Sequence, residues 1–401
     1  MPPEHALHLA YTLPVPARSG YEHRVWQLCR NLSRTLDITL LSRSMTPTVP
    51  VAANDHAIKF RTLHLPRPRL GEKLRKGMRF LFSSYPIMAG GWYFPEMARA
   101  IEEELRRTPR DLIVLEGIWL SVYWPFIEHW PALKVINHYD LEPESLRRQA
   151  EILPAGLAKW LYRNAARRMV KLESRLVRKA DLNWVTSRRE QQILLGRNPG
   201  ARIEVAPNGV DTNRLKPLPA VEGSREILFV GALSYLPNMD GVSFFVQQVL
   251  PLIRQKRPDI VFRVVGKNPA PSIKALHRPP EVEITGEVEE LESWYRRAAL
   301  CVVPLRAGGG TRLKILEAMA YGRPVVSTSL GAEGIDAASG RDILIADRPE
   351  DFAQAVLDLL QHPDRMRSMA ENARALVDEK YGWSSIADFM TDTYRKMSPA
   401  S

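Results

Sequence analysis

Short apolar runs alternate with longer helical patterns through most of this 401-residue chain. Each run is followed by a polar or glycine-containing loop, which is typical of strands buried in a parallel sheet. Because strands that alternate with helices form parallel sheets covered on both faces, the sequence predicts an α/β fold with doubly wound sheets. The predicted strands are Leu7–Leu13, Ile38–Ser42, Ile58–Leu65, Leu112–Glu116, Leu133–Asn137, Leu182–Thr186, Ile203–Ala206, Ile227–Val230, Ile260–Gly266, Val282–Thr285, Leu300–Pro304, Pro324–Thr328 and Ile343–Ile345.

The alternation runs twice, and a turn-rich segment separates the two runs. Val205–Asp211 contains a Pro-Asn-Gly turn, and Pro217 and Pro219 follow it. We therefore predict one domain over residues 1–208 and a second over residues 209–383. Two doubly wound domains joined by a short hinge leave a cleft at the carboxyl ends of their strands, where such sheets bind ligands. The predicted helices include Gly20–Leu36, Pro95–Arg107, Leu157–Lys179 and Ser384–Lys396.

Three observations limit the class of protein. Cys29 and Cys301 stand at no metal-binding or redox spacing, which argues against a disulfide framework. The longest uncharged stretch, the 16 residues Phe80–Pro95, is too short and too broken by proline and glycine to cross a membrane as a helix. The N-terminus lacks the basic start and apolar run of a signal peptide, so a cytosolic protein is expected.

Charge is distributed unevenly between the two halves. The formal net charge is +11, of which residues 1–216 carry +13 and residues 217–401 carry −2. We expect either that the two halves meet different partners or that only one of them meets an anionic surface. A basic face exposed to solvent would explain the same excess of positive charge.

The segment Pro304–Pro324 places three glycines between a predicted strand and a predicted helix. Thr311 is expected to cap this helix and Gly322 to end it. Free amides at a helix N-terminus, beside a loop without side chains, form an anion site. Arg312 and Lys314 in the first turn oppose the helix dipole, so an external anion such as a diphosphate is expected to bind there.

An acidic residue completes this pattern. Glu317 lies one turn further along the helix, within reach of the two hydroxyls of a ribose. A glycine-rich turn with surface basic residues would explain the glycines alone, but the combination with cap, cations and acid favours phosphate binding. The segment is not a Walker loop, and no G-x-G-x-x-G opens the first strand–helix unit.

The same segment resembles the signature of family 4 glycosyltransferases, retaining enzymes of the GT-B fold. The resemblance is strong over residues 205–360 and weaker in the N-terminal half. It implies two Rossmann-like domains that face each other across a cleft, an N-terminal acceptor-binding domain and a C-terminal donor-binding domain, with the last helix, residues 384–401, joining the first domain. Companion motifs of the family are Pro207–Asp211, Phe229–Ala232, Val264–Gly266, Thr285–Val288 and Gly331–Gly334.

The resemblance implies a nucleotide-diphosphate sugar as donor and a glycan or lipid-linked acceptor, in the biosynthesis of a surface polysaccharide. Carried over to this sequence, it implies catalytic roles for His138, Arg312 and Lys314. The donor-binding residues that it implies are Gly20, Gly231, Gly266, Gly286, Val288, Gly308, Gly309, Gly310, Thr311 and Glu317.

The sequence departs from the family pattern at two places. Glu317 matches the second Glu of the family's Glu-x7-Glu motif, but Gly309 stands where the first would be. The loop Gly231–Asn238 lacks the Arg and Lys that many members carry. Arg312 and Lys314 are therefore the expected partners of the diphosphate.

No metal ion or other cofactor is expected. The chain has no D-x-D pair of aspartates, no H-E-x-x-H and no other His/Cys cluster with ligand spacing. Arg312, Lys314 and helix amides would then stabilise the departing diphosphate. The resemblance implies substitution on the same face of the sugar, in which the leaving phosphate accepts the acceptor's proton.

Residues 59–94 combine basic and aromatic side chains. Leu70, Leu74, Met78 and Leu81 recur at helical spacing among basic residues, and an aromatic-rich uncharged stretch follows them. Such a segment suits an anionic membrane surface, which would make the protein peripheral on the inner membrane face; a helix packed on the first domain would explain it equally.

Features of the sequence bear on three other classes of function. A non-catalytic nucleotide- or sugar-binding GT-B subunit is favoured by Gly309 and opposed by the intact Arg312, Lys314 and Glu317. A nucleotide-sugar epimerase stays open because a fold alone does not fix the chemistry. Nucleic-acid binding is not expected, because no recognised module accompanies the basic half.

Overall fold

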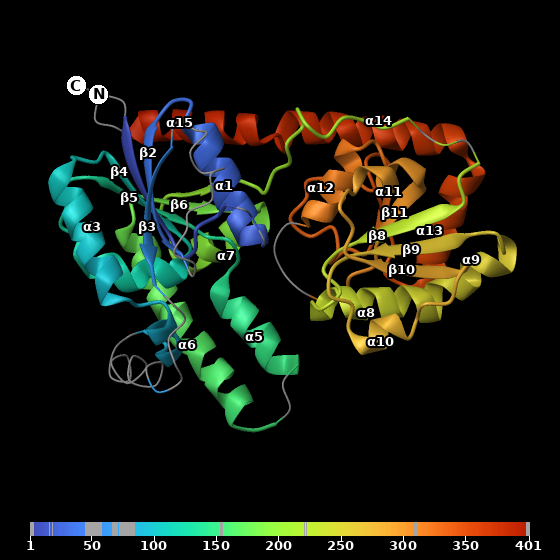
Figure 1. The fold of residues 1–401 in the computed structure, drawn as a ribbon, viewed down its shortest axis with the longest axis horizontal. Coiled ribbons are helices and arrows are strands. Elements are labelled where there is room, and N and C mark those ends of the chain that lie inside the picture. Colours follow the sequence, from blue (N-terminus) through green and yellow to red (C-terminus); the bar gives the residue numbers. More distant parts are fainter. Residues whose placement is uncertain are drawn as a thin grey trace. The chain divides into compact units, whose positions relative to one another are not determined.

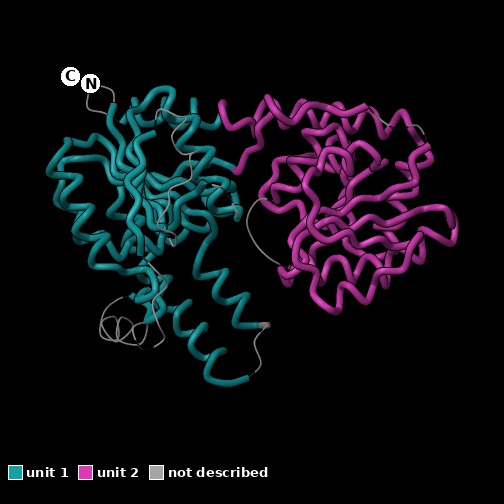
Figure 2. Tube along the Cα trace, viewed as in Figure 1, with its two compact units in different colours: residues 1–207, 386–401 teal, residues 208–385 magenta. Residues whose placement is uncertain are grey.

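The computed structural model describes residues 4–44 other than 16 and 18, 58–65, 71, 85–152, 155–307 other than 220 and 222, and 312–397. The chain forms two compact units, coloured separately in Figure 2. The first comprises Met1–Pro207 with Ile386–Ser401, and the second comprises Asn208–Ser385.

The first unit is built on a seven-stranded sheet whose neighbouring strands all run parallel, in the order β3-β2-β1-β4-β5-β6-β7. The central strands β1 and β4 are buried along almost their whole length, because helices cover both faces (Figure 1). Its strands are β1 (His5–Ala10), β2 (Asp37–Ser44), β3 (Ile58–His64), β4 (Leu112–Glu116), β5 (Leu133–Asn137), β6 (Leu182–Val185) and β7 (Ile203–Val205). Its helices are α1 (Gly20–Leu32), α3 (Pro95–Arg107), α4 (Trp124–Ile127), α5 (Glu142–Ile152), α6 (Leu157–Lys179), α7 (Arg188–Arg197) and most of α15 (Trp383–Met397), with 3₁₀ turns at Ile87–Gly91 and Ile118–Tyr123.

The last helix packs into the first unit although 178 residues of the second unit precede it. The Trp184 indole donates to the Tyr394 hydroxyl at 3.0 Å, and both side chains are fully buried. Thr391 makes a further hydrogen bond to Thr35 at 3.1 Å. Helix α15 therefore covers strand β6 and the end of helix α1.

The second unit is built on a six-stranded parallel sheet in the order β10-β9-β8-β11-β12-β13. Its buried apolar residues form one cluster of their own, separate from that of the first unit. Its strands are β8 (Glu226–Val230), β9 (Val261–Val265), β10 (Val282–Gly286), β11 (Ala298–Val303), β12 (Val325–Ser327) and β13 (Leu344–Ile345). Its helices are α8 (Leu236–Phe244), a π-helical turn (Phe245–Val249), α9 (Leu250–Lys256), α10 (Pro271–Lys274), α11 (Glu292–Arg297), α12 (Leu313–Ala320), α13 (Pro349–Gln361) and α14 (Pro363–Lys380).

These two sheets confirm the predicted α/β class with parallel sheets. Every predicted strand corresponds to an observed strand, with ends that differ by at most three residues. The first helix is shorter than predicted: it ends at Leu32, not Leu36. Ser33 and Thr35 explain the early end, because their hydroxyls bond to the carbonyls of Arg30 and Leu32 and offer the backbone an alternative to the helix.

The prediction of a membrane surface in residues 59–94 needs correction for the residues that the structure describes. Tyr93 and Phe94 are buried in the core of the first unit, and Trp92 stacks on Trp119 at 5.6 Å between ring centroids. These aromatic rings are packed and not free for lipid, because an uncharged aromatic stretch also suits a domain core. The predicted basic helix, near residues 70–81, lies almost entirely outside the described residues.

Among the described helices, none has both the length and the apolar character that crossing a membrane requires.

Candidate functional site

Four neighbouring strands of the second sheet end close to predicted donor-binding residues. Gly231 follows β8, Gly266 follows β9 and Gly286 ends β10. The loop after β11 leads into helix α12 and contains Gly308, Gly309, Gly310 and Thr311, which lie outside the described residues. Since the strands are parallel and adjacent, these segments share the carboxyl edge of the sheet, which is where open α/β sheets bind ligands.

Two of these glycines lie where an added Cβ would meet a neighbour, the backbone at Gly266 and side chains at Gly231. A Cβ on Gly266 would overlap the carbonyl oxygen of Gly231. A Cβ on Gly231 would stand 2.6 Å from the Lys314 ammonium and 2.8 Å from the Asn238 amide nitrogen. Gly286 has a φ of +78°, a backbone conformation that residues with a Cβ rarely adopt, so conformation and not space favours glycine there. The glycines therefore let side chains from α8 and α12 reach the strand ends.

Val288 lies two residues beyond Gly286 and is partly buried. It packs against the apolar core of the second unit. Its side chain supports the loop after β10.

Lys314 is held over the end of β8. Its ammonium donates to Asn238 Oδ1 at 2.8 Å and lies 4.1 Å from the centre of the Phe229 ring. Asn238 is oriented by its own bond to the Ala232 carbonyl at 2.8 Å. Burial, reinforced by the nearby Arg312, lowers the pKa of Lys314 to about 7 although Glu317 opposes the shift. The ammonium has no carboxylate partner at bonding distance among the described residues and is therefore available to an anion.

Arg312 immediately precedes helix α12. The structure places Arg312, with extended backbone angles, at the N-cap position, so the prediction of Thr311 as the cap is wrong. Leu313 is the first helical residue, which moves Arg312 out of the first turn. The residue is 8% exposed, and its guanidinium donates to the Ala307 carbonyl at 3.5 Å. The predicted C-terminal stop is confirmed, because Gly322 has a φ of +70° directly after the helix.

Glu317 lies one turn after Lys314 on helix α12 and is partly exposed. Burial raises the pKa of this carboxyl to about 7, against the lowering effects of Lys314, the Tyr295 hydroxyl and Arg214. Tyr295 is fully buried and stacks on Tyr321 at 4.7 Å between centroids. Sequence reasoning did not find Tyr295, which is 22 residues from Glu317 and carries no motif.

In the first unit, Gly20 is the first residue of helix α1, and the Ser19 hydroxyl caps this helix by accepting from the Glu22 amide at 3.2 Å. A Cβ at Gly20 would meet nothing within 4 Å, so space does not require glycine here.

His138 directly follows strand β5 and is 1% exposed. Its Nε2 contacts Asn183 Oδ1 at 3.2 Å, and its Nδ1 has no partner among the described residues. Burial lowers the pKa of His138 to about 4, partly opposed by Asn183. The imidazole is therefore neutral at pH 7 and is an inward-facing side chain of this unit.

Residues 224–362 match the family model described as Glycosyl transferases group 1. This range contains all six strands of the second sheet and the Gly231, Lys314 and Glu317 constellation. The second unit carries a group 1 glycosyltransferase domain.

The curated relatives of this chain are matched over only part of their own length. An uncharacterized 44.6 kDa protein in the cps region of Klebsiella pneumoniae is 28% identical over 39% of this chain and 42% of its own. A D-inositol 3-phosphate glycosyltransferase of Catenulispora acidiphila is 29% identical over 51% of this chain and 52% of its own. The chain thus spans about half the length of these two relatives. The D-inositol 3-phosphate glycosyltransferase of Rhodococcus opacus is 27% identical over 75% of this chain and 70% of its own.

Solved structures extend the likeness in fold to both units. A sucrose-phosphate synthase from Thermosynechococcus elongatus has a TM-score of 0.72 at 18% identity, covering 99% of this chain and all of that one. HepE of Anabaena, solved in complex with UDP-glucose, has a TM-score of 0.68 at 15% identity, covering 97% and 98%. These neighbours confirm the predicted GT-B fold.

Sequence reasoning missed a buried cluster in the first unit. His8 Nδ1 lies 2.6 Å from Glu116 Oε1, and Cys29 Sγ lies 3.7 Å from the same nitrogen. The prediction that the chain has no His/Cys cluster rested on sequence spacing, and the fold brings together residues up to 108 positions apart. Burial opposes a charge on His8, but Cys29 and Glu116 raise the pKa of His8 to about 10.

The donor atoms of His8, Cys29 and Glu116 lie within 4.8 Å of one another, so this cluster is where a metal ion would find three ligands. The geometry fits an ion pair better. The distance between His8 and Glu116 is that of a hydrogen bond, and Glu116 Oε2 also accepts from Asn137 at 2.8 Å and Tyr139 at 2.5 Å. The carboxylate is already satisfied, so we interpret the cluster as a buried imidazolium–carboxylate pair.

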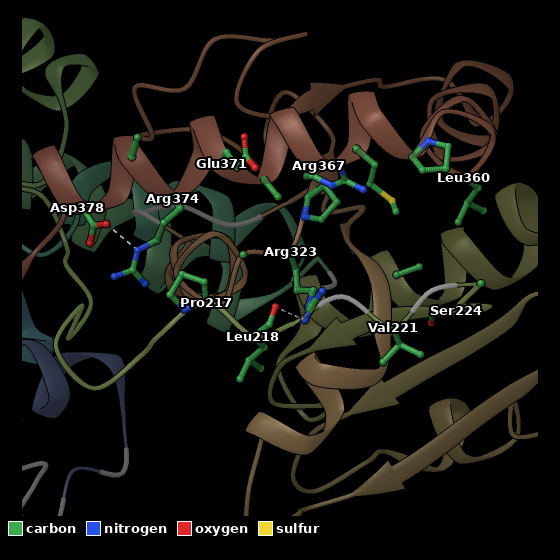
Figure 3. Close-up of a pocket in the computed structure, with 18 of the residues that line it drawn as sticks. Pro217, Leu218, Val221, Ser224, Arg323, Leu360, Arg367, Glu371, Arg374 and Asp378 are labelled. Atoms are coloured by element: carbon green, nitrogen blue, oxygen red, sulfur yellow. Dashed lines mark hydrogen bonds and ion pairs between the residues drawn. The ribbon is translucent and has the colours of Figure 1, made fainter.

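A cavity of about 910 Å³ lies elsewhere in the second unit, between helix α14 and the segment after Pro217 (Figure 3). Ala299 and Pro324, at the amino ends of their strands, line it, so it opens at the edge of the sheet opposite the donor-site glycines. Arg323 projects into this region and donates to the carbonyls of Leu218 and Pro219. None of the predicted site residues lines the cavity.

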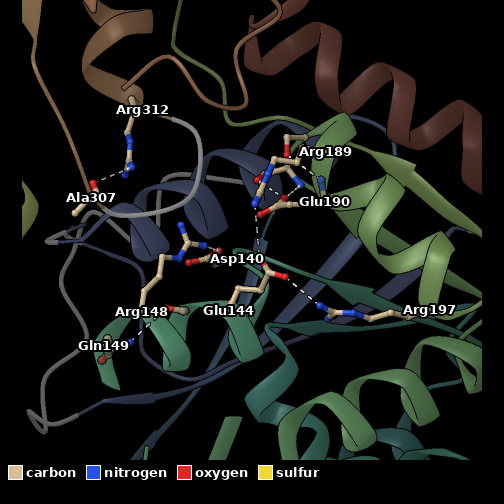
Figure 4. Close-up of polar contacts among 12 residues, drawn as sticks. Asp140, Glu144, Arg148, Gln149, Arg189, Glu190, Arg197, Ala307 and Arg312 are labelled. Atoms are coloured by element: carbon tan, nitrogen blue, oxygen red, sulfur yellow. Dashed lines mark hydrogen bonds and ion pairs between the residues drawn. The ribbon is translucent and has the colours of Figure 1, made fainter. Parts of the chain in front are cut away.

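Ion pairs join three helices at the carboxyl edge of the first sheet (Figure 4). Arg197 of α7 pairs with Glu144 of α5 at 3.0 Å. It also contacts Glu173 of α6 at 3.4 Å. Asp140 faces Arg148 at 3.7 Å. Burial raises the pKa of Glu173 to about 8, partly opposed by Arg197. This network ties the bases of α5 and α6 to the body of the unit.

Proposed function

We propose that the protein transfers a sugar from a nucleotide-diphosphate sugar, held by the second unit, to a glycan or lipid-linked acceptor. The family match over residues 224–362 supports glycosyl transfer. The likeness to HepE, solved with UDP-glucose, supports a nucleotide-sugar donor, and the relative in a cps region supports a role in surface polysaccharide synthesis.

The observation that carries this proposal is the placement of Lys314. Its ammonium, which has no carboxylate partner at bonding distance in the described part of the chain, stands over the end of β8, where Gly231 leaves no side chain between it and the backbone. A pyrophosphate seated there would meet a cation, the amides of a glycine loop and the amino end of α12, all of which stabilise negative charge.

The same groups provide the chemistry of the transfer. Negative charge grows on the diphosphate as the bond to the sugar breaks, and preorganised cations at that position lower the barrier. Arg312 and Lys314 would supply this stabilisation without a metal ion. We further propose that the sugar is a hexose, that its configuration is retained and that the leaving phosphate accepts the acceptor's proton.

Glu317 would bind the ribose of the nucleotide. It lies one helical turn from Lys314, which suits a ribose next to a diphosphate. A carboxylate accepts hydrogen bonds from two hydroxyls, so the ionised form is the binding form. Because Gly309 has no side chain, backbone amides or another group would make the contact to the donor sugar.

Calorimetric titration with UDP, GDP and ADP, each with and without EDTA, tests the proposal. We expect one nucleotide to bind, equally well with EDTA, and its sugar to be turned over slowly to free sugar. Loss of binding in EDTA would contradict the metal-free interpretation. Tight binding without any turnover or transfer would favour the non-catalytic subunit.

A further inference from the structure

Helices α5 and α6 form a hairpin in the first unit, and the end where α6 begins extends away from the sheet (Figure 1). An ion pair from Arg197 to Glu144 and a hydrogen bond from Arg197 to Glu173 fix the base of this hairpin. Its opposite end, from residue 155 to Leu161, we call the hairpin tip.

The hairpin tip exposes three large apolar side chains. Leu157 is 73% exposed, Trp160 is 58% exposed and Leu161 is 37% exposed. They stand at positions i, i+3 and i+4 of a helix and therefore lie on one side of it. Further along α6, Ala165 and Met169 are buried in the core, so the apolar side chains of the tip are additional to those that hold the helix in place.

A row of cations begins beside these apolar side chains. Arg163, Arg167 and Lys171 follow Trp160 at steps of three or four residues, and all three are exposed. No described carboxylate pairs with any of them. Like charges four residues apart on a helix repel one another, so this row weakens the helix unless an external anion neutralises it.

We propose that the hairpin tip docks on an anionic phospholipid bilayer. Leu157, Trp160 and Leu161 enter the boundary between headgroups and acyl chains, and the cation row lies against the anionic headgroups. Indole rings favour this boundary, and exposed basic residues within a Debye length of it are attracted to anionic lipid.

Two other occupants suit the tip less well. A second copy related by a two-fold axis would place Arg163, Arg167 and Lys171 against the same cations of the other chain. A nucleic acid would neutralise the cations but would leave Leu157 and Leu161 without an apolar partner. The proposal does not depend on the identity of the acceptor, and it concerns residues outside the segment 59–94.

Co-sedimentation of the full chain with vesicles tests the proposal. Binding is expected to vesicles of phosphatidylcholine with phosphatidylglycerol, weakly to phosphatidylcholine alone, and to fall at high salt. The variant R163Q/R167Q/K171Q is expected to lose roughly fivefold in affinity for each charge removed. R225Q/R278Q/R367Q, which removes three exposed arginines of the second unit, is the matched control and should bind normally.

The apolar part of the tip has its own test. L157S/W160S/L161S is expected to lose at least tenfold in affinity, whereas Leu195→Ser, which removes an exposed leucine of α7, should have no effect. Because all four side chains are exposed, the variants should fold, which circular dichroism checks. Unchanged vesicle binding by the tip variant, equal binding to neutral and anionic vesicles, or a tip-dependent dimer in place of vesicle binding would each overturn the proposal.

A depth measurement separates insertion from surface adsorption. A fluorophore on W160C can be attached selectively, because the native Cys29 and Cys301 are buried. Nitroxide groups on the upper acyl chain should quench this fluorophore, and a fluorophore on S145C near the start of α5 should not be quenched. Equal quenching at both positions would contradict docking by the tip.

Discussion

The carbonyl oxygen of Gly231 occupies the space that a Cβ of residue 266 would need. The two glycines follow adjacent parallel strands, and the Gly231 amide bonds to the Val265 carbonyl at 2.9 Å. This close approach brings the ends of β8 and β9 together below the Lys314 ammonium. The geometry of the candidate donor site therefore depends on glycines at these two positions as much as on the cations above them.

Gly266→Ala is expected to destabilise the second unit. The added methyl group must displace the Gly231 backbone, which costs about 1–3 kcal/mol, equivalent to a fall in Tm of roughly 2–4 °C per kcal/mol. Gly20→Ala is the control, because its Cβ would meet nothing within 4 Å and the residue is helical. Thermal unfolding checks both; an unchanged Tm for Gly266→Ala would show that the strand ends separate easily.

Lys314→Met is expected to weaken nucleotide binding while raising the stability of the ligand-free unit at pH 7. The pKa of Lys314 is lowered to about 7 in the folded chain, so folding disfavours its charge and the stability of the wild type decreases as pH falls from 10.5 toward 7. Methionine removes that penalty and also removes the cation. Calorimetry and thermal unfolding give the two readouts, with Lys274→Met on α10 as the control. A parallel loss of both binding and stability would indicate a structural lysine.

Nucleotide affinity is expected to be greatest near pH 7. A diphosphate binds the charged form of Lys314, so affinity should fall as pH rises above about 7. A ribose binds the ionised form of Glu317, so affinity should also fall as pH drops below about 7. Titration calorimetry from pH 5 to pH 9 measures the profile. The alkaline limb should disappear in Lys314→Met, and its persistence there would assign it to another group.

Glu317→Gln is expected to affect ribose recognition specifically. The amide accepts from one hydroxyl where the carboxylate accepts from two, so affinity for the ribonucleoside diphosphate should fall about tenfold. The 2′,3′-dideoxy analogue, which lacks both hydroxyls, should bind wild type and variant equally. Equal losses for both ligands would place Glu317 away from the ribose.

Glu116→Gln is expected to destabilise the first unit by about 3–5 kcal/mol, because it leaves the His8 imidazolium buried without its counterion. The pKa of His8 is raised from 6.5 to about 10 in the folded chain, so this pair stabilises the unit fully below pH 6.5 and the contribution is lost as pH rises to about 10. Urea unfolding at pH 6, 8 and 10 measures the slope, which the variant should lack. A wild type equally stable at all three pH values would argue for a neutral imidazole.

The fold and the donor edge could be predicted because their signals are local. Apolar runs such as Leu112–Glu116 are strands in both the prediction and the structure, and Gly231, Gly266 and Gly286 each follow or end a strand as the motifs indicate. Their spacing along the chain was sufficient to place them on one edge.

Other features depend on contacts that no local pattern carries. His8 and Glu116 pair across two strands, and Tyr295, on a different helix, influences the pKa of Glu317. The aromatic stretch ending at Phe94 left a membrane surface and packing on the first domain equally open, because its sequence does not distinguish lipid from a domain core. The predicted N-cap of α12, Thr311, is one residue before the observed N-cap, Arg312. Helix propensity does not determine the first residue of a helix to within one position.

The packing of Tyr394 on Trp184 has a consequence for biosynthesis. A ribosome that has finished the first 207 residues has not yet made the helix that covers β6, and must synthesise the whole second unit before Ile386–Met397 emerge. Until this helix emerges, the Trp184 side of the first unit's sheet is uncovered, while the second unit can complete its own core. The unit that begins synthesis first is thus the last to be finished.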